Sequence, residues 1–480
     1  MADNKMKKGF ATYLLILLLV ILAAFLIVIV IMLFSPFQNI IGFQYMTYNT
    51  DNDYQYRTTA GEELDFSTID EININCDKAS VRVERAIQVQ GDAIKFENYC
   101  KGFAYASDRT DFTYEIYFSD AEKSILNVEV HEPEGFLFFD DNMVISIIVP
   151  STSEYALENT KVNISTDSGN VMIANQTALV SDVTVSALRN SISLNSFDIR
   201  SNRGNVYLYS YIDDTLDDVF IKTNSGTVFM QIDKYDITNS IEFHSISGNV
   251  RLNSINYTGE EANVDNIVFD VENGAFNVES VTGNIKLNMD SGYLDINSLH
   301  GNLSSSDSVQ QMESAEIRVN SMNGDLNLPF ANNSTVSVNS LSKDNQVFIK
   351  GNGGNITIGE MDGYAHIETT SGNVNVTNYS NDMIVKTTSG NIDVKYDSNA
   401  IDSQLIFSSS SGRIDIGIRS GFKCIAEFLN TNGNRDNSKV DIQFQVDDFT
   451  NPQLINVNNE QDEGSIMTVT SDSDVTISLI

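Results

Sequence analysis

Carboxylates at regular places along the chain are the side chains best suited to chemistry. Asp295, Asp393 and Asp415 each stand three residues after a glycine, in short stretches where apolar and polar residues alternate. Alternate residues of a strand point to opposite faces, so we expect these carboxylates to share one outward sheet face. Paired carboxylates there would suit a polysaccharide lyase or hydrolase. Equivalent positions elsewhere hold Asn, Lys or Arg, which favours a non-catalytic protein.

Other catalytic and cofactor motifs are missing from the sequence. The four histidines, His131, His244, His300 and His366, stand at unrelated places without metal-ligand spacing. The sequence has no GxSxG elbow, phosphate-binding loop or dinucleotide fingerprint. We therefore expect no cofactor, with Ca²⁺ on the acidic surface as the alternative left open.

The charge balance excludes one class of partner. The chain carries 65 acidic and 29 basic residues, a formal net charge of -36. Nucleic-acid binding needs clustered Lys and Arg to replace the counterions of the phosphates, so we expect no nucleic-acid partner. Outward acidic residues keep a long β surface soluble and block strand edges from pairing. A surface that collects divalent cations or cationic polymers is the second interpretation.

The cysteines are too few for a disulfide framework. Cys76 and Cys100 could pair in an oxidising compartment, and we keep this pair as a candidate disulfide. The alternative for Cys76 is a small core residue, because it continues the alternation of Ile72 and Ile74. Cys424 has no evident partner in the sequence.

A repeated strand–turn–strand unit must position all these residues. In the stretch from Met383 to Val394, apolar residues alternate on both sides of a glycine. An apolar residue stands five positions before the glycine and two and four after it, and Thr or Ser stands three before it. This pattern predicts structural turns at Gly169, Gly204, Gly226, Gly248, Gly283, Gly324, Gly372, Gly390 and Gly412.

Each position of the repeat has an expected role. We expect positive φ at the glycine, a bond from the Thr or Ser hydroxyl to the turn, and a stacked ladder of the Asn residues that follow. Apolar residues such as Val228, Val250, Val374 and Ile392 should face inward. The glycine spacing predicts coils of about 18 to 22 residues with two turns each, only one of which always needs glycine.

The repeat makes the chain an all-β protein, a single-stranded β-helix or solenoid. We assign residues 159–480 to the repeat solenoid with a C-terminal cap, and residues 64–158 to an N-terminal cap and the first coils. Within that cap, the segments 98–111 and 132–141 read as loops.

The N-terminal segment predicts a membrane anchor. Leu14 to Phe34 are continuously apolar and would form a helix about 31 Å long, the thickness of a bilayer core. We assign residues 1–9 to a cytoplasmic tail, 10–35 to a transmembrane signal anchor and 36–63 to a juxtamembrane linker. Lysines precede the span and none follows it closely, so we expect a single-pass protein with its C-terminal domain outside the cell.

Particular motifs also suggest a family. The succession from Ile145 to Ile173, together with the Thr-Thr-Ser-Gly-Asn turns that begin at Thr369 and Thr387, resembles a bacterial adhesin family of unknown function. The resemblance implies a membrane-anchored, right-handed β-helix outside the cytoplasm. It brings no binding residues to this chain.

These observations lead to one expected function and two alternatives. We expect a non-catalytic adhesion or cell-envelope interaction module at the cell membrane, with a glycan, cell-wall or host-surface ligand. An envelope-stress-associated membrane component is one alternative, which the family resemblance permits. A β-helix polysaccharide lyase or hydrolase is the other.

Overall fold

A computed structural model of the chain describes residues 16–25 and most of the chain from residue 43 to residue 480. Within the second range, the residues outside the description are 87–88, 90, 106–111, 133–136, 151–156, 158–159, 175–195, 211–214, 233–235, 259–266, 306–311, 313, 330, 343–344, 398–401, 420–421, 423, 435, 437, 443–453 and 458–464.

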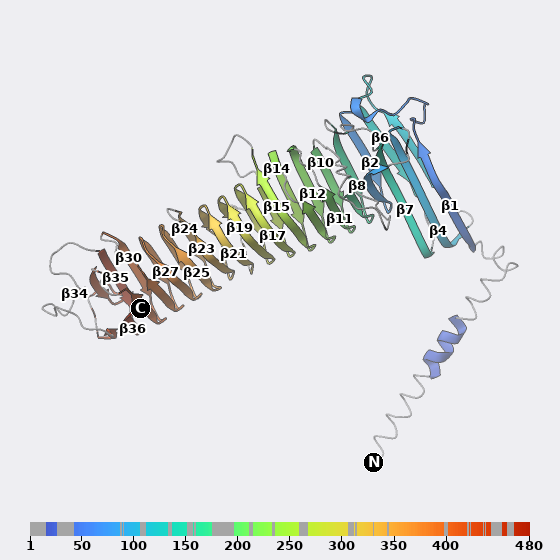
Figure 1. The fold of residues 1–480 in the computed structure, drawn as a ribbon. Coiled ribbons are helices and arrows are strands. Elements are labelled where there is room, and N and C mark those ends of the chain that lie inside the picture. Colours follow the sequence, from blue (N-terminus) through green and yellow to red (C-terminus); the bar gives the residue numbers. More distant parts are fainter. Residues whose placement is uncertain are drawn as a thin grey trace, which may run out of the picture.

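Parallel strands stack coil on coil into an elongated rack (Figure 1). Two columns of strands run the length of the rack, and each strand pairs in parallel with the equivalent strands of the coils before and after it. Column A contains β8 (Lys161–Thr166), β10 (Ser196–Ser201), β12 (Thr215–Thr223), β14 (Asp236–Ser245), β16 (Ile267–Val271), β18 (Ile285–Met289), β20 (Leu303–Ser305), β22 (Leu326–Leu328), β24 (Val347–Gly351), β26 (Ala365–Thr369), β28 (Met383–Thr387) and β30 (Gln404–Ser409).

Column B carries the second strand of each coil. It contains β9 (Val171–Ala174), β11 (Val206–Ser210), β13 (Val228–Ile232), β15 (Val250–Tyr257), β17 (Ala275–Thr282), β19 (Tyr293–His300), β21 (Glu316–Asn323), β23 (Thr335–Leu341), β25 (Ile356–Met361), β27 (Val374–Tyr379), β29 (Ile392–Tyr396) and β31 (Ile414–Ile418). The register advances 22 residues from Val206 to Val228 and 18 from Val374 to Ile392, which confirms the predicted coil length.

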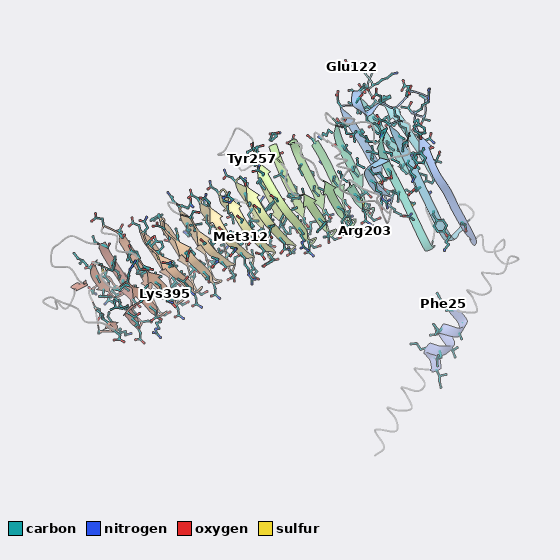
Figure 2. All side chains as sticks on the ribbon, in the orientation of Figure 1. Phe25, Glu122, Arg203, Tyr257, Met312 and Lys395 are labelled. Atoms are coloured by element: carbon teal, nitrogen blue, oxygen red, sulfur yellow. The ribbon has the colours of Figure 1, made fainter. Side chains whose placement is uncertain are left out.

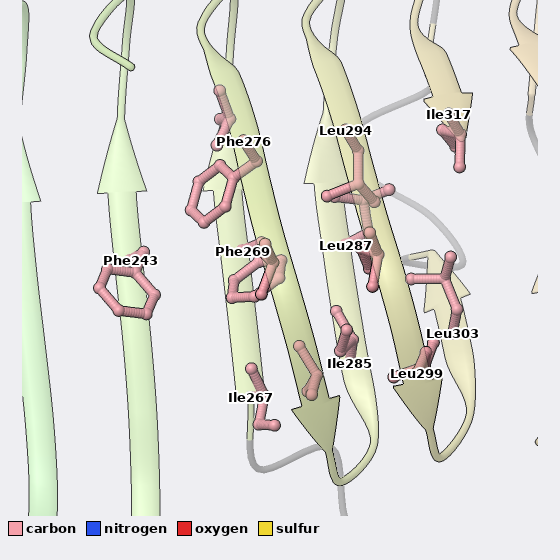
Figure 3. Close-up of a cluster of buried hydrophobic side chains, with 14 of the residues drawn as sticks. Phe243, Ile267, Phe269, Phe276, Ile285, Leu287, Leu294, Leu299, Leu303 and Ile317 are labelled. Carbon is pink, nitrogen blue, oxygen red and sulfur yellow. The ribbon is translucent and has the colours of Figure 1, made fainter. Parts of the chain in front are cut away.

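The core lies between the two columns and runs along the rack. Val228, Val250 and Val374 are 1% exposed and Ile392 is 0% exposed, so the predicted inward positions are confirmed. Figure 3 shows Phe269 of column A beside Phe276 of column B, with ring centroids 4.4 Å apart. Alternation along each strand places every second side chain in this apolar layer, and the layers of successive coils form one continuous cluster.

The N-terminal end contains both parallel and antiparallel strands. It holds η1 (Phe66–Thr68), β1 (Phe43–Gln55), β2 (Glu71–Cys76), β3 (Ser80–Ala86), β4 (Ala93–Tyr105), β5 (Thr113–Phe118), β6 (Ile125–His131) and β7 (Leu137–Pro150). The β2–β3 coil lies between β6–β7 and β8–β9, while β5, β4 and β1 add antiparallel pairs outside it. These antiparallel strands cover the first parallel edges.

Two predictions for this end need correction. Residues 43–55 lie in the predicted linker 36–63, yet they form β1 and pair with β4 over most of its length. The predicted loops 98–111 and 132–141 overlap β4 and β7, which pair with each other. β1 and β4 pair only with antiparallel neighbours, and β7 has β4 as an antiparallel neighbour on the side away from β3, so these strands lack the glycine turn signature.

The C-terminal end also interleaves its strands. Here lie β32 (Cys424–Leu429), β33 (Val440–Ile442), β34 (Leu454–Val457), β35 (Ser465–Ser471) and β36 (Val475–Leu479). β35 pairs with β30 on one side and β32 on the other, and β36 lies between β31 and β33. The last strands of the chain therefore form an inner coil, and β32 and β33 lie outside it.

The predicted membrane anchor lies mostly outside the described residues. Residues 16–25 are helical, and the exposed fraction of their large apolar side chains runs from 51% at Ile16 to 67% at Phe25. Among the described residues, no helix has the length and apolar character that crossing a membrane requires.

Candidate functional site

The predicted turn glycines form columns of their own along the rack. A β-carbon added at Gly204 would lie 1.8 Å from the carbonyl oxygen of Gly169, and one added at Gly226 would lie 1.9 Å from that of Gly204. The same stacking recurs for Gly248 on Gly226 and for Gly412 on Gly390. Each glycine therefore leaves room for the backbone of the preceding coil.

This steric reason replaces the one expected from the sequence. Positive φ was the predicted requirement, but among the described glycines of the predicted turns only Gly283 has it, with φ of 132°. Gly283 begins a second column at the other turn, where Gly301 has φ of 153° and an added β-carbon at Gly324 would lie 2.0 Å from the Gly301 carbonyl oxygen. Close coil-to-coil approach is the commoner cause.

Side chains at the turns supply the predicted hydrogen bonds. The Gly226 N–H donates to Thr223 Oγ1 at 2.8 Å, and the Gly390 N–H donates to Thr387 Oγ1 at 2.9 Å. The Asn ladder is also present, and Asn oxygens in it accept a backbone N–H from the next coil: Asn391 N donates to Asn373 Oδ1 at 2.9 Å. The hydroxyl contacts satisfy backbone N–H groups within one turn, and the Asn contacts satisfy N–H groups of the next coil.

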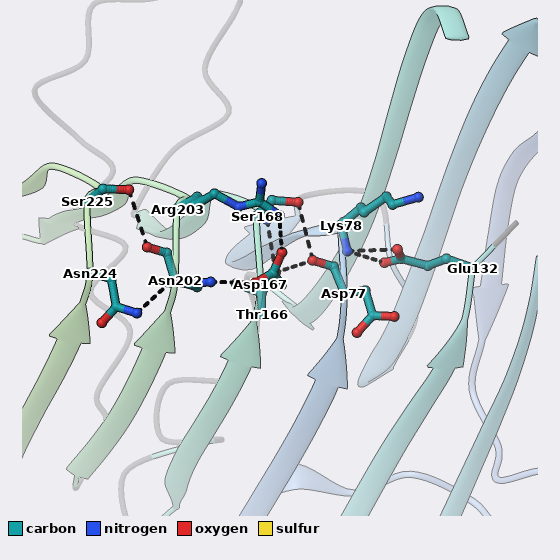
Figure 4. Close-up of polar contacts among 11 residues, drawn as sticks. Asp77, Lys78, Glu132, Thr166, Asp167, Ser168, Asn202, Arg203, Asn224 and Ser225 are labelled. Atoms are coloured by element: carbon teal, nitrogen blue, oxygen red, sulfur yellow. Dashed lines mark hydrogen bonds and ion pairs between the residues drawn. The ribbon is translucent and has the colours of Figure 1, made fainter. Parts of the chain in front are cut away.

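The turn ladder ends on a buried carboxylate at the N-terminal end. Figure 4 shows Glu132, whose two oxygens accept the Lys78 N–H at 2.8 and 2.7 Å; its Oε1 also accepts the Ala79 N–H at 2.6 Å. Arg203 and Asn202 of a later coil bond to Asp167 in the same row. Glu132, which follows β6, thus provides the acceptors that the turn backbone of a coil provides elsewhere in the rack.

The cysteine pair does not form. Cys76 lies buried in β2 with its Sγ 3.4 Å from the Ala79 carbonyl oxygen, whereas Cys100 is buried in β4 between β1 and β7. Burial raises the pKa of the Cys76 thiol to about 12, with a smaller contribution from Glu132. Cys76 is therefore the small core residue that the alternation suggested, and the disulfide is absent because the two thiols lie in different strand pairs.

The outward face of column B carries a row of large polar and aromatic side chains. Six adjacent strands, β11, β13, β15, β17, β19 and β21, place one residue each in strict register. We call this the six-strand row; its members are Tyr207, Phe229, Arg251, Asn277, Asp295 and Arg318. The Arg251 guanidinium lies 6.0 Å from the centre of the Phe229 ring.

A groove lies beside the middle of this row. Its volume is about 530 Å³, and Leu252 and Val278, which are almost fully buried, contribute to its lining. The polar lining comes from the row itself and from residues two positions further along the strands. These polar residues are Arg251, Asn277, Glu279, Asp295, Asn297 and Asn320.

The second set of lining residues lies where the strands bend. The register of β17, β19 and β21 skips Glu279, Asn297 and Asn320. Asn297 donates from Nδ2 to Glu279 Oε1 at 2.8 Å, and Asn320 donates in the same way to Asn297 Oδ1 at 3.0 Å. These bonds hold the amide planes in line along the rack.

The row itself is held by neighbouring side chains. Tyr293 donates its hydroxyl to Asp295 Oδ2 at 2.9 Å, and the Arg318 guanidinium lies 5.5 Å from the Tyr293 ring centre. Burial, with the bond to Asp295, raises the pKa of the Tyr293 hydroxyl. A neutral Tyr293 keeps donating at physiological pH, so Asp295 stays oriented.

The three aspartates of the sequence analysis do share one face. Asp393 and Asp415 are register neighbours in β29 and β31, and they continue the register that contains Asp295. Only Asp295 lines the groove. Arg413 Nε donates to Asp415 Oδ1 at 2.7 Å, so this carboxylate is already paired. The proximity of Asp393 and Asp415 follows from the strand register, and neither of them lines this groove.

The sequence of this rack identifies a known family. The profile of Toastrack DUF4097, a domain of unknown function, matches residues 69–359, more than half of the chain. The chain belongs to the Toastrack DUF4097 family. A comparison with curated proteins finds no match.

The Toastrack match begins just before β2 and ends within β25, so it includes the six-strand row and the groove. It supports the solenoid-like fold that the repeat predicts. The remaining coils of column A and column B, from β26 to β31, extend the same stacking beyond the matched residues.

Two histidines lie among carboxylates on the outward face of column A. His244 Nδ1 lies 2.9 Å from Asp270 Oδ2 and its Nε2 lies 3.1 Å from Glu242 Oε2; His366 Nε2 lies 2.9 Å from Glu368 Oε1. The hydrogen bond with Asp270 raises the pKa of His244. Within the described residues, no group of three or more His, Cys, Asp or Glu side chains could hold a metal ion.

Sequence reasoning missed the bend residues of the groove. A signal for them exists, because an Asn or Glu followed by Ser and an apolar residue recurs at positions 279–281, 297–299, 320–322 and 339–341. The apolar residue of each triplet is buried, as Val281, Leu299, Met322 and Leu341 show. That repeat marks the point where a column B strand turns around the core.

Proposed function

We propose that this Toastrack protein is a membrane-anchored, extracytoplasmic solenoid that binds a surface glycan or cell-wall ligand without catalysis. The groove on column B carries the proposal. It combines an apolar floor with amide, carboxylate and guanidinium groups held by their neighbours, the arrangement expected of a preformed ligand site.

The N-terminal segment supports the membrane part of the proposal. Its described residues are helical, and their large apolar side chains are exposed. The apolar stretch from Leu14 to Phe34 is about as long as a bilayer core when helical. An exposed apolar helix at one end of an acidic rack would place the rack outside a membrane, with adhesion or envelope interaction as its role.

The membrane arrangement is tested with the full chain carrying an N-terminal tag. Protease added to intact cells should degrade the rack and leave the tag protected. Removing residues 10–35 should release the protein from the membrane fraction. A tag that is cleaved from outside would reverse the orientation, and a protein that stays soluble with the segment intact would refute anchoring.

Ligand binding is tested by adhesion of cells that display the full chain to glycan arrays and to isolated cell-wall material. Asp295→Asn combined with Arg251→Ser should abolish attachment, because both side chains line the groove. Asp393→Asn is the matched control, since it removes a carboxylate from the same face outside the groove. If the unaltered chain, the double variant and Asp393→Asn all attached equally well, the groove would not be the binding site.

A specific observation favours a second function, glycan cleavage. The groove holds two carboxylates, Glu279 and Asp295, and a carboxylate pair is the usual machinery of glycoside hydrolysis. Release of reducing ends from a glycan by the purified protein, lost in Glu279→Gln, would establish this activity. Binding that persists without any product would favour adhesion.

A further inference from the structure

We propose that the ligand of the groove is a linear, uncharged polysaccharide that lies lengthwise along the rack, with one sugar ring over each coil. This inference rests on the proposed binding function and specifies the chemical class and the direction of its ligand.

The spacing of the six-strand row supports the lengthwise direction. Its members lie in adjacent hydrogen-bonded strands from Tyr207 to Arg318. Neighbouring strands are about 4.7–4.9 Å apart, close to the length of one sugar ring in an extended chain. A polymer lying along the rack would therefore meet an equivalent side chain at every ring, whereas a polymer lying across it would meet only one or two strands.

The side chains of the row differ along its length in a way that suits a sugar polymer. Tyr207 and Phe229 are half-buried rings at one end, and aromatic faces pack against the apolar faces of sugar rings. Asn277, Asp295 and Arg318 follow, with donors and acceptors for hydroxyl groups. The row thus offers an aromatic platform that leads into a polar groove.

The bend residues give the groove a second polar line parallel to the first. Glu279, Asn297 and Asn320 are joined by hydrogen bonds from one coil to the next. Two parallel lines of polar groups, both running along the rack, flank the space where a polymer would lie. The second line covers β17, β19 and β21, so it would contact the rings that lie beyond the aromatic end of the row.

Charge selects an uncharged polymer over an acidic one. The groove is lined by one guanidinium, two carboxylates and three amides, and the whole chain carries a net charge of -36. A polyanion such as a uronic-acid polymer would be repelled by this field at low and moderate ionic strength. Hydroxyl and acetamido groups would find partners among the amides and carboxylates.

The test uses the full chain in lipid nanodiscs and calorimetric titration with β-1,4-linked oligomers of glucose and of N-acetylglucosamine, in a series from two rings to eight. Affinity should rise with each ring and level off at about six rings, one for each strand of the row. Phe229→Ala should weaken the longest oligomers about three- to tenfold and move the plateau to about four rings. Phe348→Ala is the control, because it removes a half-buried ring from the outward face of column A. It should change neither the affinity for the longest oligomers nor the number of rings at which affinity levels off.

Several results would overturn this inference. Equal affinity for two and eight rings would indicate a single sugar subsite, and tighter binding of oligogalacturonate would contradict the charge argument. Adhesion to a surface without binding of either neutral series would refute the polysaccharide while leaving the binding function intact. Absence of adhesion altogether would refute the proposed function itself.

Discussion

Replacing one glycine of the turn column should separate two coils. At Gly390, an added β-carbon would lie 1.9 Å from the Gly372 carbonyl oxygen and 2.8 Å from Thr387 Oγ1. Real β-carbons essentially never come within 3.0 Å of such atoms, so the two turns must move apart by about 1.1 Å. The atom in the way is backbone, and no side-chain rotation can remove it.

The cost follows from the bonds that such a movement breaks. Thr388 N and Ser389 N both donate to the Thr370 carbonyl oxygen, at 3.1 and 2.9 Å, and Asn391 N donates to Asn373 Oδ1 at 2.9 Å. Lengthening each by about 1 Å exceeds hydrogen-bond distance. At about 0.5–1.5 kcal/mol per bond, Gly390→Ala should cost about 3 kcal/mol of local stability.

Hydrogen exchange read by mass spectrometry on peptides from β26 to β31 measures this local loss directly. A repeat array can open at one interface without unfolding completely, so a single global transition would understate the effect. Gly91→Ala is the matched control, since nothing lies within 4 Å of its added β-carbon. It should be neutral or slightly stabilising. If the two variants exchanged alike, steric stacking would not be the reason why glycine recurs at these turns.

Three further changes test other contacts. Thr387→Val leaves the Gly390 N–H without its acceptor and should cost about 1–3 kcal/mol, whereas Thr387→Ser should not; urea unfolding compares them. The raised pKa of His244 means that its charged form stabilises the fold at pH below the ordinary value of 6.5, and that this stability is lost as pH rises through the raised pKa. His244→Asn should therefore be destabilising by up to about 1 kcal/mol at pH 5.5 and neutral at pH 8.5, and an equal effect at both would contradict this. Burial raises the pKa of Asp92 to about 6, so ionisation costs stability as pH rises through that value; Asp92→Asn should raise the unfolding midpoint at pH 7.5 and leave it unchanged at pH 4.

The repeat was predictable because it is local. Each inward Val or Ile, each hydroxyl and each glycine stands at a fixed distance from its neighbours in the sequence, so one unit from Met383 to Val394 describes the others. The cause of the glycine requirement was not predictable. Gly226 must be small because Gly204 lies against it, and no pattern within a single turn reveals which backbone atoms the next coil presents.

The ends and the groove depend on contacts that are distant in sequence. β1 and β4 pair antiparallel although β2 and β3 lie between them in the sequence, so no local pattern joins them and their polar residues read as linker and loop. The groove follows from the bends at Glu279, Asn297 and Asn320, where a strand that seemed to alternate changes direction. Asp295 was identified by its position, but its neighbours in the groove required the register.

The position of β35 and β36 between earlier strands affects how the protein folds during its synthesis. These strands leave the ribosome after β30–β33, yet they fit between β30–β31 and β32–β33. Until β36 has been made, the gap between the earlier strands stays unfilled, and the apolar side chains that line it are exposed to water. A nascent chain halted before Ser465 would therefore expose apolar surface on both strand pairs, and it would be a target for chaperones and proteases.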